Sequence, residues 1–479
     1  MRYSKVLLIN PRIAGSYLGP VRPPVSLGYL GQSLEISGVQ AEMIDLALGY
    51  KLRHLWDKIE RFKPELIGVT VWTYKYKDTY NLIRIIKRKY PGIHIVVGGP
   101  HISTLRVEAL GECSEIDFGV VLEGESTLIE LCQGKDFSEI KGLMYYQDKK
   151  LLYNGDREFI TELDSIPFPK YQKLELSKYF LKEITLISSR GCPYSCIYCP
   201  VKLAIGRNWR ARNAKSVVDE IEYWYNKSYR RFNFTDDNFT FFKERVYEIC
   251  DEVQSRGLKN LDLHCGNGIR ADKVDKPLLK RMKEVGFNYI GLGVEAGNNR
   301  ILKNLRKGES IEQIEQTIKD ACDLNYDVTL FFLAGSPGET SADIEDSVRL
   351  AEKYPVFEAR FYNIIPYPGT ELFAWLNEKK LFLRDPQDYL NDASAFSDKP
   401  LFETEELSRK ERVKMFRRLR KVENLILKKT IKRKLGKFGW AGRFAAIFLS
   451  PKIIYYFIRH QKFMRRLFEK VRSDAFVIG

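Results

Sequence analysis

The chain has 479 residues, room for about three domains of 150 residues each, and 44% of its residues are hydrophobic, which is ample for ordinary buried cores. Its net charge of +16 is unevenly distributed: residues 409–479 hold 22 Lys and Arg against 4 Asp and Glu, whereas the other residues hold 56 against 58. Composition therefore excludes a generally basic protein, and any anionic partner would bind the C-terminal part.

Cysteine usage and the N-terminal residues bear on the cellular compartment. Five of the eight cysteines are scattered without a pairing pattern, which indicates a reducing compartment: Cys113, Cys132, Cys250, Cys265 and Cys322. The first residues run straight into a predicted strand, without the apolar stretch and cleavage site of a signal peptide. We therefore expect a cytoplasmic protein.

Residues 1–140 alternate short apolar runs with helical patterns. The predicted strands are 5–10, 41–46, 66–71, 94–98 and 118–122, and the predicted helices lie near 25–37, 51–62, 78–89, 103–111 and 126–132. Alternation of continuous apolar strands with helices predicts a parallel, doubly wound, Rossmann-like sheet. Ligands of such sheets bind beyond the carboxyl ends of the strands.

Glycines and small residues gather at those strand ends, where a backbone without side chains lets a flat or bulky ligand approach closely. With Pro23-Pro24 and Leu27-Gly28 after the first strand, the arrangement resembles a cobalamin-binding domain. The resemblance implies cobalamin contacts from Thr70, Thr73, Gly98, Gly99, His101, Glu123 and Gly124. The D-x-H-x-x-G sequence that supplies a cobalt ligand in some cobalamin proteins is absent, so we expect no histidine on cobalt. The alternative is a flavodoxin-like module that binds nothing.

Residues 141–180 have a mixed pattern that prolines interrupt at 165–169. Proline disfavours regular structure at and before its own position. We interpret this stretch as a structured linker between two domains.

A cysteine-rich loop follows at 190–200, where Cys192, Cys196 and Cys199 are spaced C-x3-C-x2-C. Three thiolates leave one iron of a [4Fe–4S] cluster open, whereas a closed ferredoxin site uses four. A zinc site usually takes four ligands as two spaced pairs, and no fourth Cys or His lies nearby. This spacing, with Tyr198 before the last cysteine, resembles the signature of the radical S-adenosylmethionine (SAM) superfamily. Together with the first domain, the chain resembles the cobalamin-binding branch of that superfamily.

Residues 181–400 repeat strand–helix units. The predicted strands are 184–188, 232–235, 261–265, 289–294, 328–333 and 360–365. We predict a partial (β/α)6 barrel, which the superfamily resemblance also implies. Barrel chemistry concentrates at the carboxyl ends of the strands, and five of these ends are unusually polar here.

The ends of the predicted barrel strands offer the groups that SAM needs. Carboxylates suit an ammonium and ribose hydroxyls, and arginine suits a carboxylate through bidentate hydrogen bonds. By resemblance, Asp236 or Asp237 would bind the ammonium of SAM and Arg270 its carboxylate. The other implied contacts are Glu295 to the ribose, and the backbone around Tyr198 and from Gly335 to Gly338 to the adenine. For each residue alone, helix capping or a surface ion pair is the alternative.

We treat residues 401–479 as a basic helical tail. Ser408 and Glu411 cap a long helix with an apolar stripe, and apolar-aromatic segments with Trp440 and 455–456 follow among Lys and Arg. No apolar run is long enough to span a membrane. The pattern resembles an interfacial anchor, so we expect residues 409–479 to contact the inner, anionic face of the membrane. An RNA-binding tail and a solvated helical extension are the alternatives.

The resemblance implies an enzyme in which one electron from the cluster cleaves SAM to methionine and a 5′-deoxyadenosyl radical, which removes hydrogen from a C–H bond. With cobalamin beside the barrel, C-methylation of an unactivated carbon is the leading hypothesis, and a lipid or isoprenoid substrate follows if the tail docks on membrane. The electrons would come from a reductant such as flavodoxin or ferredoxin.

Several alternatives stay open. Relatives with the same domains also catalyse ring formation, ring contraction or oxidation. An RNA-modifying enzyme would explain the basic tail but would need three more cluster cysteines, and Cys113 and Cys132 are too few. A non-catalytic Fe–S scaffold would explain the cysteine loop but not the polar strand ends.

Overall fold

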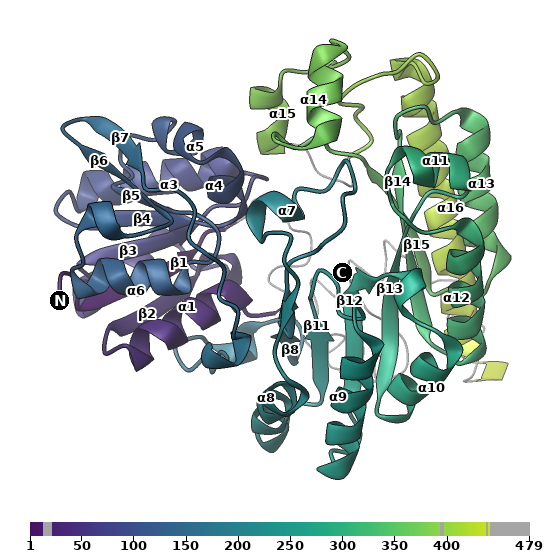
Figure 1. Cartoon of the computed structure of the whole chain (residues 1–479), viewed down its shortest axis with the longest axis horizontal. Helices are drawn as coiled ribbons and strands as arrows, with labels where there is room; N and C mark the ends of the chain where they lie inside the picture. The colour runs from purple at the N-terminus through teal and green to yellow at the C-terminus, as the bar shows by residue number, and fades with distance from the viewer. Residues whose placement is uncertain (13–21, 393–396, 437–438, 441–479) are drawn as a thin grey trace.

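The computed structural model describes residues 1–12, 22–392, 397–436 and 439–440. It contains two α/β units side by side, each built on its own sheet, with helices α14 and α15 above the gap between them in the view of Figure 1.

The N-terminal sheet has the strand order β2-β1-β3-β4-β5-β6-β7, and its first five strands are parallel. They are β1 (Lys5–Asn10), β2 (Gln40–Asp45), β3 (Leu66–Thr70), β4 (His94–Gly98) and β5 (Phe118–Val120). Helices α1 (Val25–Ile36) and α6 (Glu125–Gln133) pack together on one face. The other face carries α3 (Tyr76–Lys89), α4 (Pro100–Leu105) and α5 (Val107–Gly111). Helix α2 (Leu52–Phe62) lies beside the end of α3, where Trp56 packs against Tyr90. The predicted doubly wound, Rossmann-like sheet is confirmed.

The stretch interpreted as a linker begins with two further strands of this sheet. β6 (Leu143–Gln147) pairs antiparallel with β5, and β7 (Lys150–Tyr153) pairs antiparallel with β6. Asp148 and Lys149 both have positive φ, as a two-residue hairpin turn requires. Such turns usually contain glycine, so the Asp-Lys pair carried no recognisable turn pattern and the hairpin was missed.

The second sheet has six parallel strands in the order β15-β14-β13-β12-β11-β8. They are β8 (Glu183–Leu186), β11 (Arg231–Phe234), β12 (Asp262–Ile269), β13 (Phe287–Glu295), β14 (Asp327–Ala334) and β15 (Glu358–Asn363). Each strand lies beside the next one in sequence, as repeated strand–helix units require. The six predicted strands of the partial (β/α)6 barrel are confirmed.

Helices cover the outside of this sheet (Figure 1). They are α8 (Ala214–Asn226), α9 (Lys243–Ser255), α10 (Lys276–Glu284), α11 (Asn299–Asn304), α12 (Ile311–Asp323) and α13 (Ser341–Lys353). The remaining short elements are β9 (Ser189–Arg190), β10 (Arg210–Ala211), α7 (Val201–Ala204), α14 (Glu371–Glu378) and α15 (Pro386–Asp392). A capping box formed by Ser310 and Gln313 begins α12.

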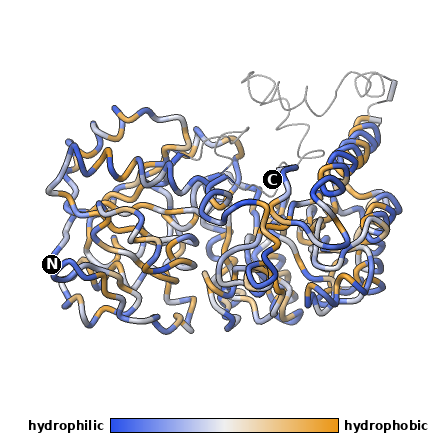
Figure 2. The backbone as a smooth tube through the Cα atoms, turned by 90° about the horizontal axis from the view of Figure 1, so that it is seen from above, coloured by the Kyte–Doolittle hydropathy of each residue, from blue (hydrophilic) through white to orange (hydrophobic). Residues whose placement is uncertain are grey.

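The first part of the predicted tail is one long helix, α16 (Arg409–Gly436), which packs against β15 and α13. Its predicted apolar stripe is buried there, in the company of Phe416: Met415, Leu419, Val422 and Ile426. Figure 2 shows mainly hydrophilic residues along α16, interrupted by apolar ones. This stripe therefore closes the edge of the barrel sheet and is not free to contact a lipid surface.

The apolar-aromatic segments beyond Trp440, including 455–456, lie outside the described residues. Trp440 itself is 84% exposed. None of the helices in the described part of the chain has both the length and the hydropathy that crossing a membrane requires.

Candidate functional site

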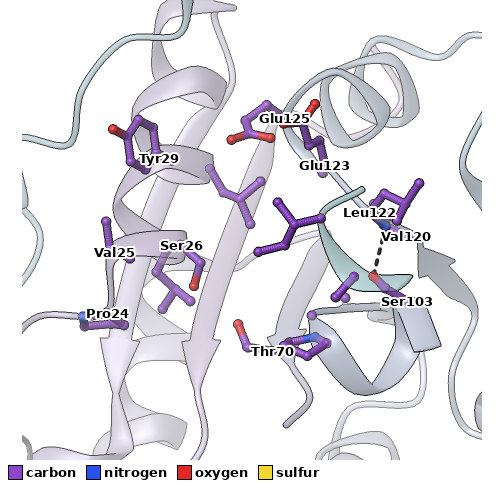
Figure 3. A pocket seen from close by; sticks show the side chains of 18 of the residues that line it. Pro24, Val25, Ser26, Tyr29, Thr70, Ser103, Val120, Leu122, Glu123 and Glu125 are labelled. Atoms are coloured by element: carbon purple, nitrogen blue, oxygen red, sulfur yellow. Dashed lines mark hydrogen bonds between the residues drawn. The ribbon is translucent and has the colours of Figure 1, made fainter. Parts of the chain in front are cut away.

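A cavity of about 380 Å³ opens at the carboxyl ends of the N-terminal strands, a volume within the range of small-molecule sites. Of the residues predicted to contact cobalamin, Thr70, Gly98, Gly99, Glu123 and Gly124 line it. Figure 3 shows Thr70 on one side of the cavity and Glu123 with Glu125 on another. The barrel domain supplies further lining residues: Ile187, Ser189, Arg190, Ala204, Ile205, Thr235 and Asp237.

The edge of this cavity is shaped by backbone without side chains. Gly99 has a φ of +105°, and a Cβ built on it would lie 2.9 Å from the Val71 carbonyl oxygen and 3.2 Å from Thr70 Cγ2. Only glycine fits this position without strain. Behind the edge, apolar side chains form the wall: Leu8, Val69, Val97, Val120 and Leu128. A glycine edge over an apolar wall suits the flat, large ring of cobalamin.

Two of the predicted cobalamin residues do not line the cavity. His101 is fully buried and stacks on Tyr76, with ring centroids 4.3 Å apart. Burial lowers the pKa of His101 to about 4, so the imidazole is neutral at physiological pH. Thr73 is absent from the lining, whereas its neighbour Trp72 lines the cavity and is 43% exposed. The sequence signal that could have identified Trp72 is an aromatic residue directly after the predicted strand 66–71.

Glu123 lines the cavity, but its carboxylate is engaged with the barrel domain. It accepts hydrogen bonds from Arg210 Nη1 at 2.8 Å, from Arg190 Nη1 at 3.1 Å and from the Ile160 N–H at 2.9 Å. Glu125 accepts from Arg190 Nη2 at 2.7 Å. Sequence reasoning selected Glu123 for cobalamin and missed this set of ion pairs.

The cysteine loop follows β9 and leads into α7. Cys196 is buried, whereas Cys192 and Cys199 are half-buried. The loop is fastened by backbone hydrogen bonds from the Cys192 N–H to the Gly206 carbonyl and from the Cys199 N–H to the Cys196 carbonyl, both 3.2 Å. Gly191 has a φ of +90°, and a Cβ there would lie 2.3 Å from the Asn208 carbonyl oxygen, so the turn before Cys192 requires glycine.

The charges around these thiols fit an anionic cluster. Burial raises the pKa of Cys196, and the cations Lys307 and Arg270 act against that rise. Burial also raises the pKa of Cys199 to about 12, so binding iron must displace its proton. No three His, Cys, Asp or Glu side chains among the described residues converge tightly enough to hold a single metal ion. The spacing of the three cysteines in the sequence is the feature that fits a cluster.

Asp236 and Asp237, the alternatives for the SAM ammonium, differ sharply in their surroundings. The buried Asp236 carboxylate accepts hydrogen bonds from the Ser188 N–H at 2.7 Å, the Ser188 hydroxyl at 2.5 Å and the Ser189 hydroxyl at 2.7 Å. Asp237 lines the cavity, and its carboxylate has no hydrogen-bond or ion-pair partner among the residues that the structure describes. Burial and Asp236 raise its pKa to about 6. Asp237 is therefore the carboxylate available to a ligand.

Arg270 lies beside the cysteine loop, with its guanidinium 3.5 Å from the centre of the Tyr194 ring. Its Nε donates to Asp272 at 2.9 Å and its Nη1 to the Lys307 carbonyl at 2.9 Å. Its Nη2 is buried without a partner in the described structure. A buried donor without an acceptor is costly, so this atom is suited to a ligand carboxylate.

Glu295 ends β13 in a left-handed conformation, with φ of +64°. Its carboxylate accepts from Lys307 Nζ at 3.1 Å, and it lies close enough to Tyr198 to raise the pKa of that hydroxyl further than burial does alone. Lys307 also lies 3.3 Å from Glu309. The residue predicted to bind the ribose and the one predicted to flank the adenine are thus neighbours. A strained backbone at such a strand end is common in binding sites.

The loop from Gly335 to Gly338 is fixed from two sides. Glu339 accepts from the N–H groups of Gly335 at 2.6 Å and Ser336 at 2.9 Å, and burial raises its pKa to about 7. From α16, the fully buried Arg412 donates Nη1 to the Gly335 carbonyl at 2.9 Å. Arg412 was missed because nothing in its local sequence separates it from the exposed cations around it.

Comparisons with known proteins agree with this geometry. A model of the B12 binding domain matches residues 11–132, and a model of the radical SAM superfamily matches residues 186–351. An uncharacterized methyltransferase of Pyrococcus horikoshii is 30% identical, over 80% of this chain and 85% of that protein. The anaerobic magnesium-protoporphyrin IX monomethyl ester cyclase of Rubrivivax gelatinosus is 27% identical, over 78% and 70%.

A solved structure shares the fold. The radical S-adenosylmethionine methyltransferase TsrM of Kitasatospora setae, with cobalamin and a [4Fe–4S] cluster bound, is 20% identical and superposes with a TM-score of 0.69, over 86% of this chain and 81% of TsrM. With both family models matched in order and a 30% identical relative covered along most of its length, the family is shown. The chain belongs to the cobalamin-binding radical SAM superfamily and is a cobalamin-dependent radical SAM enzyme that uses a [4Fe–4S] cluster and SAM.

Proposed function

We propose that the enzyme transfers a methyl group to an unactivated carbon of its substrate. The observation that supports this most is the shared cavity, because Gly99 and Gly124 of the cobalamin-binding domain line it together with Arg190 and Asp237 of the barrel. A corrin on the glycine edge would lie next to the SAM-binding ends of the barrel strands. Such proximity is what a methyl transfer between two cofactors and a substrate requires.

When bound, the cofactors supply the methyl group and the carbon-centred radical, which protein side chains cannot supply. The residues of this chain bind and orient them. We propose that Cys192, Cys196 and Cys199 hold the cluster, and that Asp237 and the free Nη2 of Arg270 hold the amino acid part of SAM. The contacts of Asp236 favour a structural function that joins the ends of β8 and β11.

For the rest of SAM, the described geometry supports Glu295 at the ribose and the loop from Gly335 to Gly338 at the adenine. The Glu295 carboxylate already accepts a hydrogen bond from Lys307, which also lies 3.3 Å from Glu309, so a ribose hydroxyl would join an existing network. Most backbone groups of this loop are already hydrogen-bonded: Arg412 binds the Gly335 carbonyl, and Glu339 accepts from the N–H groups of Gly335 and Ser336. Asn304 and Arg300 bind the Pro337 and Gly338 carbonyls, so the Gly338 N–H is the donor that this loop leaves, among the described residues, for the adenine edge.

Ring formation is the second candidate, because the Rubrivivax gelatinosus relative is a cyclase. Both reactions can be separated by the mass of the product. We would reconstitute the protein anaerobically with iron, sulfide and cobalamin, and incubate it with a reductant, SAM carrying a deuterated methyl group, and lipid or polar extracts of the host. Methyl transfer predicts a product with the labelled methyl group, whereas cyclisation predicts loss of two hydrogens without label.

A control without substrate separates these reactions from a non-catalytic scaffold. If the reconstituted protein with reductant and SAM forms neither 5′-deoxyadenosine nor labelled product under any of these conditions, methyl transfer by this enzyme is contradicted. A cobalamin absorption band that fails to appear after reconstitution would contradict the involvement of cobalamin.

The lipid or isoprenoid substrate depends on the C-terminal segment and stays a proposal. Because α16 is packed on the barrel, a test must keep this helix and remove only residues 441–479. We propose flotation with liposomes of anionic lipid, comparing the full chain with a variant ending at Trp440. Equal binding of the two proteins would contradict a membrane anchor, and retention of the full chain on RNA alone would favour the RNA-binding alternative.

A further inference from the structure

Four charged residues join the two domains through what we call the interdomain ion-pair network: Glu123, Glu125, Arg190 and Arg210. Arg190 bridges both carboxylates, with Nη1 3.1 Å from Glu123 and Nη2 2.7 Å from Glu125. Arg210 adds a second contact to Glu123 at 2.8 Å. The two glutamates belong to the cobalamin-binding domain and the two arginines to the barrel domain.

The network is buried, unlike most ion pairs of the molecule. The side chains of its members are between 7% and 12% exposed. Burial opposes ionisation of Glu125, but the neighbouring Arg190 holds the pKa of Glu125 below its ordinary value. Removal of one partner of such a buried pair leaves the other charge uncompensated.

On the barrel side, the network ends directly at the cysteine loop. Arg190 is two residues before Cys192 and pairs in register with Arg210 across the β9–β10 ladder. Between Arg190 and Cys192 stands only Gly191, whose positive φ and close approach to Asn208 leave it little freedom to absorb a shift. Movement of the Arg190 backbone would consequently move Cys192.

On the other side, the network begins at the cavity edge. Glu123 and Glu125 flank Gly124, and all three line the cavity, as Gly99 also does. Figure 3 shows the two glutamates beside each other at this edge. A ligand that presses on the Gly124 turn thus contacts the residues that hold Arg190.

We propose that the interdomain ion-pair network positions the cysteine loop relative to the cobalamin cavity, so that cobalamin binding and the environment of the cluster are coupled. Arg190 and Arg210 are positioning residues in this proposal, acting through Cys192. Coupling of this kind is reciprocal: if cobalamin changes SAM binding, SAM changes cobalamin binding by the same factor. The proposal rests on the cofactors of the family and does not depend on whether the reaction is methylation.

The test uses the reconstituted full chain and the EPR spectrum of its reduced cluster with SAM, with and without cobalamin. In the wild type we expect cobalamin to shift the spectrum. In E125Q we expect equal iron content but a spectrum that no longer responds to cobalamin. The rate of 5′-deoxyadenosine formation should fall on the order of tenfold to a hundredfold, since a displacement of about 1 Å has effects of that size.

The matched control is D392N, which removes an exposed interdomain pair between Asp392 and Lys75 on α15 and the start of α3. D392N should keep the wild-type response to cobalamin. A wild-type response in E125Q, or loss of the response in D392N as well, would overturn the proposal.

If E125Q does not fold, R190K replaces it, because lysine keeps the positive charge but cannot bridge Glu123 and Glu125 with a planar fork. R190K should load iron and lose the response to cobalamin, and a preserved response would overturn the proposal. These spectra need no product, so their outcome is separate from that of the methyl-transfer experiment.

Discussion

The two edges of this molecule that we propose to bind the cofactors are built in opposite ways. At the cobalamin edge the strand ends offer glycine and apolar side chains, and the acidic groups Glu123 and Glu125 are paired with the barrel. At the barrel edge the strand ends carry charges, and Arg270 Nη2 and the Asp237 carboxylate have no partner among the described residues.

This difference matches the chemistry of the two ligands. A corrin presents a broad, weakly charged ring, so a cavity can select it by shape and apolar contact. The amino acid part of SAM presents an ammonium and a carboxylate, which require charged partners. We infer that shape-changing substitutions will affect cobalamin binding and that charge-changing ones will affect SAM binding, and substitutions at either edge test this contrast.

The largest effect should come from the cysteine loop, on which both edges depend. C192S, C196S and C199S should each abolish cluster binding and 5′-deoxyadenosine formation. Serine is a poor iron ligand, and the loop offers only three thiolates to the cluster. Iron analysis and product assay after anaerobic reconstitution measure this. C250S, at a buried cysteine outside the loop, is the control, and retained activity in any of the three variants would contradict the assigned ligands.

The next largest effect should come from a substitution that changes the shape of the proposed cobalamin edge. G99V should weaken cobalamin binding tenfold or more, because a side chain at this φ clashes with the Val71 carbonyl and with Thr70, and strain of about 1–3 kcal/mol follows. Absorption titration measures the affinity, and cluster-dependent SAM cleavage should persist. G111A, where a Cβ meets nothing within 4 Å, is the matched control. Unchanged affinity in G99V would argue against recognition by shape.

Two neighbouring substitutions at the charged edge distinguish a residue that binds SAM from one that stabilises the fold. D237N should raise the Kd for SAM about tenfold, the value of one hydrogen bond to a charged group, with little change in melting temperature. D236N should instead lower the melting temperature, since Asp236 holds Ser188 and Ser189 and lies near the buried Arg245. Calorimetric SAM binding and thermal unfolding distinguish the two, and the reverse pattern would assign the ammonium to Asp236.

The sequence predicted most of this fold because its strands are continuous apolar runs separated by helical periodicity. All eleven predicted parallel strands are present, with ends shifted by a few residues. The β6–β7 hairpin was missed because Asp148 and Lys149 adopt positive φ without glycine. Sequence patterns reveal helix and strand periodicity and the residues typical of turns, so a hairpin turn made from residues that rarely form turns cannot be predicted from them.

The candidate sites were predictable only as far as strand ends are. The position of a residue after a strand says that it lies near the ligand edge but not what its side chain contacts. The stacking of His101 on Tyr76 and the ion pair of Glu123 with Arg210 were not predicted, because in each case the partner is distant in sequence. Arg412 was not predicted for the same reason, because it binds Gly335 from α16, far away in the sequence.

Arg412 offers a smaller, more remote test of the charged edge. R412M should raise the Kd for SAM several-fold, because it removes hydrogen bonds to Gly335, Leu407 and Thr404 that fix the loop. The control is R418M, which lies on the same helix as Arg412 and removes an exposed ion pair with Glu345 of α13. R418M should bind SAM normally. If R412M only lowers the melting temperature and leaves SAM affinity unchanged, α16 supports the fold but not the site.

The smallest expected effect concerns pH and the network between the two edges. Arg190 holds the pKa of Glu125 below that of the unfolded chain, about 4.3, despite burial. The stabilisation by Glu125 is therefore present above about pH 4.3 and is lost as the pH falls through the lower pKa of the folded state. Thermal unfolding of the cluster-free full chain should show wild type above E125Q at pH 7, with the difference shrinking below about pH 4.

The control for this comparison is D156N, which removes the exposed pair of Asp156 with Arg106. Exposed pairs contribute little because water screens them, so at pH 7 D156N should differ from wild type by less than E125Q does. A difference between wild type and E125Q that does not shrink in acid would mean that Glu125 stabilises the protein by packing and not by charge. The coupling proposed between the two edges would then lack its electrostatic basis, because protonated, uncharged Glu125 would hold Arg190 as well as the carboxylate does.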